Sequence, residues 1–111
     1  MKFRKYEEFT TEIQKYKIPM AEAEFAKSVN TPYGCYFRSA DDVIHANGEP
    51  IYSITTIVVE LYTERDDNQS ERDFEQWLKD KDISFRKTER AYIESEKYYQ
   101  TIYEIELMFD E

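Results

Sequence analysis

Residues 51–63, IYSITTIVVELYT, place the strongest constraint on what this chain can fold into. β-branched and aromatic residues dominate this segment, which is typical of a β-strand. A strand here has apolar side chains on both faces: Ile57, Val59 and Leu61 on one, and Ile54, Val58 and Tyr62 on the other. We therefore expect a central strand that is covered by helix on one face and by further protein, such as another subunit, on the second.

Two segments show the apolar spacing of amphipathic helices. The first covers residues 3–16 and ends before Pro19, because the residue preceding a proline avoids the helical region. The second begins at Ser70 and ends near Asp82, and Phe74, Trp77 and Leu78 form its apolar stripe. Both stripes predict helices that pack on a sheet.

Several shorter segments have strand character. Residues 20–25 alternate apolar and acidic side chains, although their Ala and Glu content leaves a helix as the alternative. Asn47-Gly48 is a strong signal for a tight turn between two strands, with a longer turn as the alternative because Glu49 and Pro50 follow it. The remaining expected strands are residues 32–37, 43–46, 84–93 and 99–109.

The resulting element order is α-β-β-β-β-α-β-β. Helices that do not alternate regularly with strands favour an α+β fold over a parallel one. With 111 residues the chain is long enough for one domain, residues 1–111. We therefore predict a single α+β domain with a mixed or antiparallel sheet packed by two helices.

The charge balance argues against several partners. The chain has 24 acidic and 15 basic residues, a formal net charge of −9. Such a surface repels nucleic-acid phosphates and anionic membranes. The single cysteine, Cys35, has no internal disulfide partner, which is typical of a reducing compartment. Without a signal peptide or an apolar stretch of about 20 residues, we expect an intracellular protein that does not enter membranes.

No set of residues with catalytic spacing stands out. His45 and Cys35 are each the only residue of their kind, and on adjacent strands they could approach one another, but a cysteine in an apolar strand is usually a buried hydrophobe. The acidic pairs Asp41-Asp42 and Asp66-Asp67 could hold a cation loosely, although such pairs are more often solvated turns. We therefore expect no enzyme, no cofactor and no metal site.

Five segments spread over most of the chain carry a family resemblance: IPMAEAEF at residues 18–25, TPYGCYF at 31–37, IVVELYTERDD at 57–67, FEQWL at 74–78 and AYIESEKYYQTIYEIEL at 91–107. With this layout the chain resembles the tail-terminator proteins, also called tail-completion or tail-to-head joining proteins, of long-tailed bacteriophages and Gram-positive prophages. The most telling pieces are VELYTERDD and IESEKYY. None of these segments is a catalytic signature.

The resemblance implies a role in virion assembly. Proteins of this family form a ring, expected here to be a hexamer, that caps the tail tube, ends its polymerisation and joins the tail to the head connector. The implied partners are further copies of the chain, the tail-tube protein and the head-connector or stopper protein. The implied location is the tail or neck of a virion assembled in the bacterial cytoplasm. DNA would only pass through, and six chains would carry about −54 charges that keep it off the channel wall.

Two polar segments are the expected interaction or lumen loops, because loops commonly carry contacts. They are residues 40–50 and 64–69, with the candidate residues Asp41, Asp42, Glu49, Glu64, Arg65, Asp66 and Asp67. Since like charges must be tolerated when a ring closes, salt or divalent cations should favour assembly. One alternative is another phage neck component, such as a head-completion or stopper protein. Others are a small enzyme or ligand-binding protein that uses Cys35 and His45, and a non-phage regulatory adaptor with a similar α+β fold.

Overall fold

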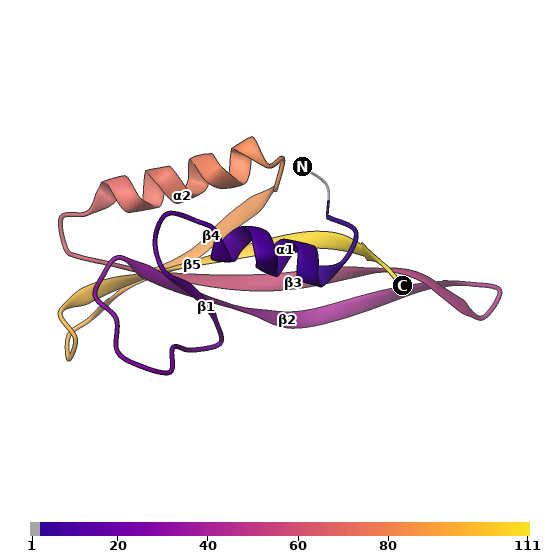
Figure 1. The fold of residues 1–111 in the computed structure, drawn as a ribbon, viewed down its shortest axis with the longest axis horizontal. Coiled ribbons are helices and arrows are strands. Elements are labelled where there is room, and N and C mark those ends of the chain that lie inside the picture. Colours follow the sequence, from indigo (N-terminus) through magenta and orange to yellow (C-terminus); the bar gives the residue numbers. More distant parts are fainter. Residues whose placement is uncertain (1–2) are drawn as a thin grey trace.

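A five-stranded sheet forms the body of the molecule, and two helices pack on one of its faces (Figure 1). The structure is a computed structural model, and it describes residues 3–111. The elements in chain order are α1 (Tyr6–Gln14), β1 (Met20–Glu22), β2 (Tyr33–Ala46), β3 (Glu49–Thr63), α2 (Asn68–Asp80), β4 (Phe85–Ile93) and β5 (Tyr98–Asp110). The strand order across the sheet is β1-β2-β3-β5-β4. Only β1 and β2 are parallel, so the sheet is mixed and the predicted α+β class is confirmed.

The strands predicted at residues 32–37 and 43–46 are one continuous strand, β2. The polar residues between them stay in the antiparallel ladder with β3, and one extra residue is taken up by a bulge between Arg38 and Ala40. Polar side chains are tolerated here because this part of β2 is exposed. The expected loop at residues 40–50 is therefore wrong: it is the end of a long β-hairpin.

The turn of this hairpin has two residues. Ala46 pairs with Glu49, which leaves Asn47 and Gly48 between the strands. Both have positive φ angles, 53° and 80°. Asn and Gly are the residues that adopt this conformation most readily, so the tight-turn prediction is confirmed.

Both helices begin where side-chain oxygens accept backbone N–H groups. At the start of α1, the Glu8 carboxylate accepts from the N–H groups of Arg4 and Lys5 at 2.8 Å each. The Asp67 carboxylate accepts from the Ser70 N–H at 3.0 Å, so α2 begins two residues before the predicted Ser70. Such caps satisfy donors that have no partner inside the helix.

β1 is a short strand, as the acidic-apolar alternation predicted, and it ends where Ala23 takes a positive φ of 65°. It packs closely on β2 beside Gly34. A Cβ at Gly34 would lie 2.5 Å from the Sδ of Met20, so a side chain there would force Met20 to move. The last two strands, β4 and β5, agree with their predicted bounds to within one residue at each end.

The core lies between the helices and one face of the sheet. Its fully buried members come from α1, β2, β3, α2 and β5: Phe9, Ile13, Tyr36, Ile57, Val59, Leu61, Phe74, Leu78 and Tyr103. Phe74 is central among the aromatic rings, and its centroid lies 5.3 Å from that of Tyr103 and 5.6 Å from that of Tyr16. Ring pairs in this geometry stabilise a core beyond their buried area.

Replacing Phe74 by alanine should lower the free energy of unfolding by about 3–5 kcal/mol, because the ring is fully buried and its removal leaves a cavity. Phe37→Ala is the matched control, since Phe37 is 36% exposed and lies outside this core. Urea denaturation of both variants measures the difference. Equal losses would contradict the placement of the core.

Candidate functional site

The two faces of the sheet differ in what covers them. In β3 every second residue from Ser53 to Thr63 is buried, whereas the residues between them are only half-buried. The buried set contains Ile57, Val59 and Leu61, which pack in the core beneath the helices. We call the opposite side, which carries the even-numbered residues of β3, the open face. The predicted division of apolar residues between two faces is confirmed, and a second subunit on the open face stays a prediction.

Carboxylates are spread along the open face. The antiparallel registers place residues of β2, β3 and β5 in rows across it, such as Phe37, Val58 and Glu104. Four successive rows each contribute one carboxylate: Glu60, Glu104, Glu106 and Asp42. β4 adds Glu89 and Arg86, so these four rows hold five carboxylates and one guanidinium, a formal charge of −4. Apolar residues, among them Val58 and the half-exposed Met108, lie between the charges.

A cluster of tyrosines occupies one end of the open face. The rings of Tyr33 and Tyr62 stack at 4.8 Å, and the hydroxyls of Tyr33 and Tyr98 lie 3.0 Å apart. Phe25, from the segment that follows β1, packs edge-on against Tyr33 at 5.6 Å. Burial raises the pKa of Tyr62 to about 12. This segment and the tyrosines enclose a hollow of about 600 Å³.

Cys35 and His45 do not form a pair. The sequence left open that they lie on adjacent strands, but both belong to β2, ten residues apart. At about 3.3 Å per residue the strand separates them by roughly 30 Å. Cys35 is buried, and burial, followed by the nearby carboxylates of Glu60 and Glu24, raises the pKa of its thiol. A ligand-binding or catalytic Cys–His site is therefore excluded within one chain.

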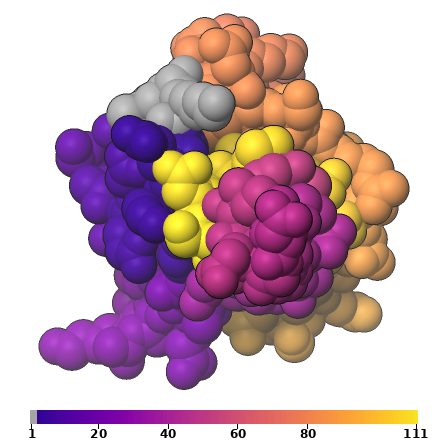
Figure 2. Space-filling view, turned by 90° about the vertical axis from the view of Figure 1, so that its right-hand side faces the viewer, coloured from indigo at the N-terminus to yellow at the C-terminus, as the bar shows by residue number. Residues whose placement is uncertain are grey.

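The hairpin of β2 and β3 projects beyond the rest of the sheet (Figure 1). Figure 2 looks onto this end of the molecule, with the magenta hairpin in front. β5 ends opposite Tyr52, so the hairpin continues past it without a third strand. Asp41 faces the helix side and accepts a hydrogen bond from the Thr55 hydroxyl at 2.6 Å, whereas Asp42 lies on the open face. Glu49 is exposed beside the turn, and Ile51 is 48% exposed.

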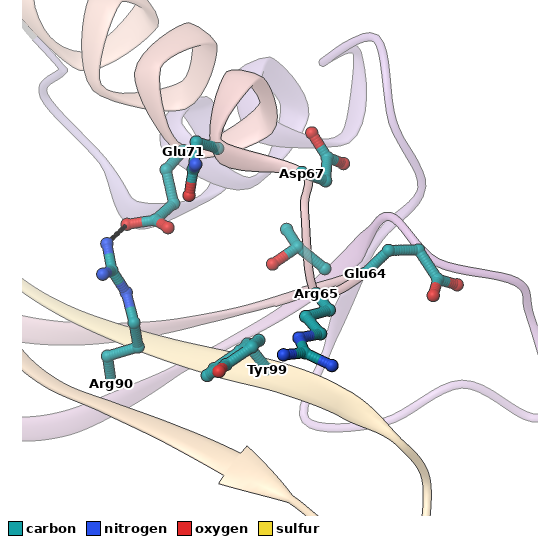
Figure 3. A pocket seen from close by; sticks show the side chains of 8 residues that line it. Glu64, Arg65, Asp67, Glu71, Arg90 and Tyr99 are labelled. Carbon is teal, nitrogen blue, oxygen red and sulfur yellow. Dashed lines mark hydrogen bonds and ion pairs between the residues drawn. The ribbon is translucent and has the colours of Figure 1, made fainter.

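The predicted residues Glu64, Arg65, Asp66 and Asp67 lie at the opposite end of β3, in the connection to α2. Glu64, Arg65 and Asp67 line a hollow of about 240 Å³. In Figure 3 the side chain of Glu64 is directed away from Arg90. The Glu64 carboxylate accepts from the Thr31 hydroxyl at 2.5 Å. Asp67 has a structural role as the cap of α2, whereas Asp66 is exposed.

A charge cluster around the buried Glu71 lines one side of this hollow, and the sequence prediction missed it. Glu71 of α2 is 5% exposed and binds Arg90 of β4 (Figure 3). Lys87 bridges Glu71 at 3.1 Å and Glu75 at 2.7 Å. Although burial opposes it, hydrogen bonds from Lys87 and from the Tyr103 hydroxyl hold the pKa of Glu75 below its usual value. The i,i+4 spacing of two glutamates was the only sequence signal, and it does not reveal their partners.

The two groups of predicted site residues are far apart. β3 has 15 residues between the hairpin turn and the connection to α2. At about 3.3 Å per residue that is roughly 50 Å. The longest extent of the molecule is 52 Å, so the hairpin and the connection mark its two ends. They cannot belong to one contact surface on a single chain.

Residues 3–111 contain no group of three His, Cys, Asp or Glu side chains that could hold a metal ion. Asp41 and Asp42, expected more often to be a solvated turn than a cation site, are successive residues of β2 and point to opposite faces of the strand. In the same part of the chain, neither helix has the length and apolar character needed to span a membrane.

Comparison with known proteins does not assign a family. No family model matches the chain, and no curated protein matches it. The resemblance to tail terminators therefore depends on the sequence segments alone.

Replacing Asp67 by alanine should lower the free energy of unfolding by about 1 kcal/mol, because α2 loses its N-terminal cap. Asp66→Ala is the matched control and should change it by less than about 0.5 kcal/mol, since Asp66 is exposed. Thermal or urea denaturation compares the two. A larger loss in the Asp66 variant would contradict this assignment.

Cys35 should react slowly with Ellman's reagent at pH 8, at least about tenfold more slowly than in the urea-unfolded chain. Two effects act in the same direction: burial restricts access, and the raised pKa reduces the thiolate fraction. Stopped-flow absorbance measures both rates. Labelling of the folded protein as fast as that of the unfolded chain would indicate an accessible, reactive thiol instead.

Proposed function

We propose that this chain is a structural subunit of a phage tail-terminator ring, which ends tail-tube polymerisation and joins the tail to the head connector. The observation that carries the proposal is the separation of its exposed features. Two unlike ends lie about 50 Å apart along the strands, with an acidic sheet face between them. The proposal assigns no reaction to the chain.

A joining ring needs two docking surfaces, one on each of its faces. When the strands run roughly along the ring axis, the hairpin end of every subunit lies on one face and the α2 connection lies on the other. The hairpin end offers the exposed apolar side chain of Ile51 beside Glu49. The other end offers the charged residues Glu64, Arg65 and Asp66. Unlike ends suit unlike partners, here the tail tube and the connector.

A joining ring also needs a channel through which DNA passes without binding. Four successive rows of the open face carry a formal charge of −4, and the helices cover the other face. With the open face towards the axis, the channel wall would repel phosphates at close range. The helices would then lie on the outside of the ring. This arrangement accounts for the acidity of the chain without a specific DNA contact.

The test is tube capping. The purified chain is added to the tail-tube protein of the same phage during polymerisation, and tube lengths are measured by electron microscopy. We expect shorter tubes with a ring at one end, because a bound ring removes the surface on which the next tube ring would assemble. Unchanged tube lengths, with no ring at the ends, would overturn the proposal.

A control variant separates capping from general effects on polymerisation. Ile51→Lys places a charge on an apolar side chain at the exposed end of the hairpin, away from the core. It should abolish or strongly reduce capping if the hairpin end docks on the tube, while the circular dichroism spectrum stays unchanged. Glu64→Lys, at the other end, should leave tube capping intact. Binding to filled heads in place of tails would favour a head-completion or stopper protein.

A further inference from the structure

Both edges of the sheet have strand segments that no other strand in residues 3–111 pairs with. β1 borders β2 only at Gly34–Tyr36, so residues 37–46 of β2 leave their outer edge open. β4 borders β5 alone, so its outer edge is open along its length. Exposed edges carry unpaired backbone N–H and C=O groups, which readily pair with another strand.

The directions of the strands allow these two edges to meet in a ring. The four long strands β2, β3, β5 and β4 alternate in direction. Rotation about an axis along the strands does not reverse them. β4 of one copy and β2 of the next are therefore antiparallel, and the alternation continues from subunit to subunit. Because the contact joins two different edges, it is the head-to-tail type that closes rings.

The charges of the two edges are complementary. Residues 39–62 contain no lysine or arginine, and the open edge of β2 carries Asp41 and Asp42. β4 carries three cations, Arg86, Lys87 and Arg90, against one carboxylate, Glu89. All three cations already have internal partners. Arg86 contacts Glu104 at 2.9 Å, yet its side chain is 74% exposed and keeps donors for a second carboxylate.

We propose that neighbouring copies of this chain join edge to edge, with β2 of one copy antiparallel to β4 of the next. This inference rests on the ring in the proposed function and names the surface that closes it. One register matches both the charges and the faces of the two strands. It pairs Asp42 with Arg86 on the open face, and Asp41 with Lys87 on the helix side. The same register places Val43 opposite Phe85, both on the helix side.

The two bulges limit the length of this contact. β2 takes up an extra residue between Arg38 and Ala40, and β4 takes one up between Lys87 and Glu89. In the proposed register the two irregularities lie near one another. Beyond them Arg38 would approach Arg90, and like charges opposite one another are unfavourable. The paired segment is therefore short: residues 40–43 of one copy lie opposite residues 85–89 of the next.

The proposed contact requires a shift along the strand direction between one edge of the sheet and the other. The size of this shift is typical of a closed sheet. Within one copy Phe85 is level with Ile57 of β3, whereas Val43 is level with Ser53. Between the two edges of the sheet, the residues to be paired are therefore offset along the strands by four residues, about 13 Å. This offset accumulates over four strands that are spaced about 4.8 Å apart. This ratio corresponds to strands tilted by roughly 35°, and closed barrels have tilts of about 35–45°.

The surface beside the start of β4 is hollowed. A hollow of about 470 Å³ opens there, lined by Thr56, Ser84, Phe85, Arg86, Glu104 and Glu106. In the proposed register the β2 strand of the next copy continues past Phe85 from Ile44 onward, alongside this hollow. The turn at Asn47-Gly48 then lies beyond the contact, free to reach a partner at the ring face.

Cysteine cross-linking tests the contact and its register. In a Cys35→Ala background, Asp42→Cys with Arg86→Cys places two thiols opposite one another on the same face of adjacent strands. With copper-phenanthroline as oxidant, and with the tail-tube protein present, we expect a ladder of covalent multimers on denaturing gels. Asp41→Cys with Arg86→Cys is the matched control. Its thiols point to opposite faces and should give at least about tenfold less cross-link.

A charge-swap series provides a second readout that needs no oxidant. Asp42→Arg and Arg86→Asp should each weaken self-association, by about fivefold per contact in sedimentation velocity, and the double variant should restore it to within about twofold. Circular dichroism checks that each variant is folded. Two single losses without restoration in the double variant would overturn the register.

The outcomes separate this inference from the proposed function. Rings that cap tubes but give no Asp42–Arg86 cross-link overturn the edge contact and leave the tail-terminator role standing. A cross-linked ladder in a protein that does not cap tubes supports the edge contact and overturns the tail role. Equal cross-linking in the control pair overturns the edge contact, because it indicates random collisions.

Discussion

The alternation of β3 is the constraint on which the rest of the structure depends. Its odd-numbered residues from Ser53 to Thr63 are buried beneath the helices, and a slip of one residue would exchange the two faces. Three of them, Ile57, Val59 and Leu61, are fully buried, and each such side chain contributes about 1.5–3 kcal/mol. β2 and β5 take their registers from β3, and β4 takes its register from β5. The position of every charge on the open face follows from this one strand.

Two kinds of charge have different roles in this protein. The cluster of Glu71, Glu75, Lys87 and Arg90 connects α2 to β4, and Glu71 is 5% exposed. Removing the cations that pair with Glu71 is costly, because its buried carboxylate is left without compensation. The carboxylates of the open face and the hairpin are exposed by comparison, and contribute little to the stability of one chain. They are therefore available for interactions with other molecules, which is where the proposed ring and channel place them.

The sequence predicted the elements better than their ends. Helical spacing identified both helices, and the last two strands were correct to within one residue at each end. Residues 38–42 were excluded from a strand because they are polar, yet an exposed strand at the edge of a sheet tolerates polar side chains on both faces. Asp67 was assigned to an interaction loop because a carboxylate in a polar segment has the same appearance whether it caps a helix or faces a partner. Only the geometry of the backbone distinguishes these two roles.

By itself the sequence determined the α+β class, the two apolar faces of β3 and the tight turn at Asn47-Gly48, because these depend on residues close together in the chain. The tertiary structure decided which distant residues are neighbours. It placed Cys35 and His45 on one strand, set Asp41 and Asp42 on opposite faces, and aligned four carboxylates in successive rows. It also separated the hairpin from the α2 connection by the length of β3. Strand register decides these relations, and register is set by packing between segments that the sequence alone does not align.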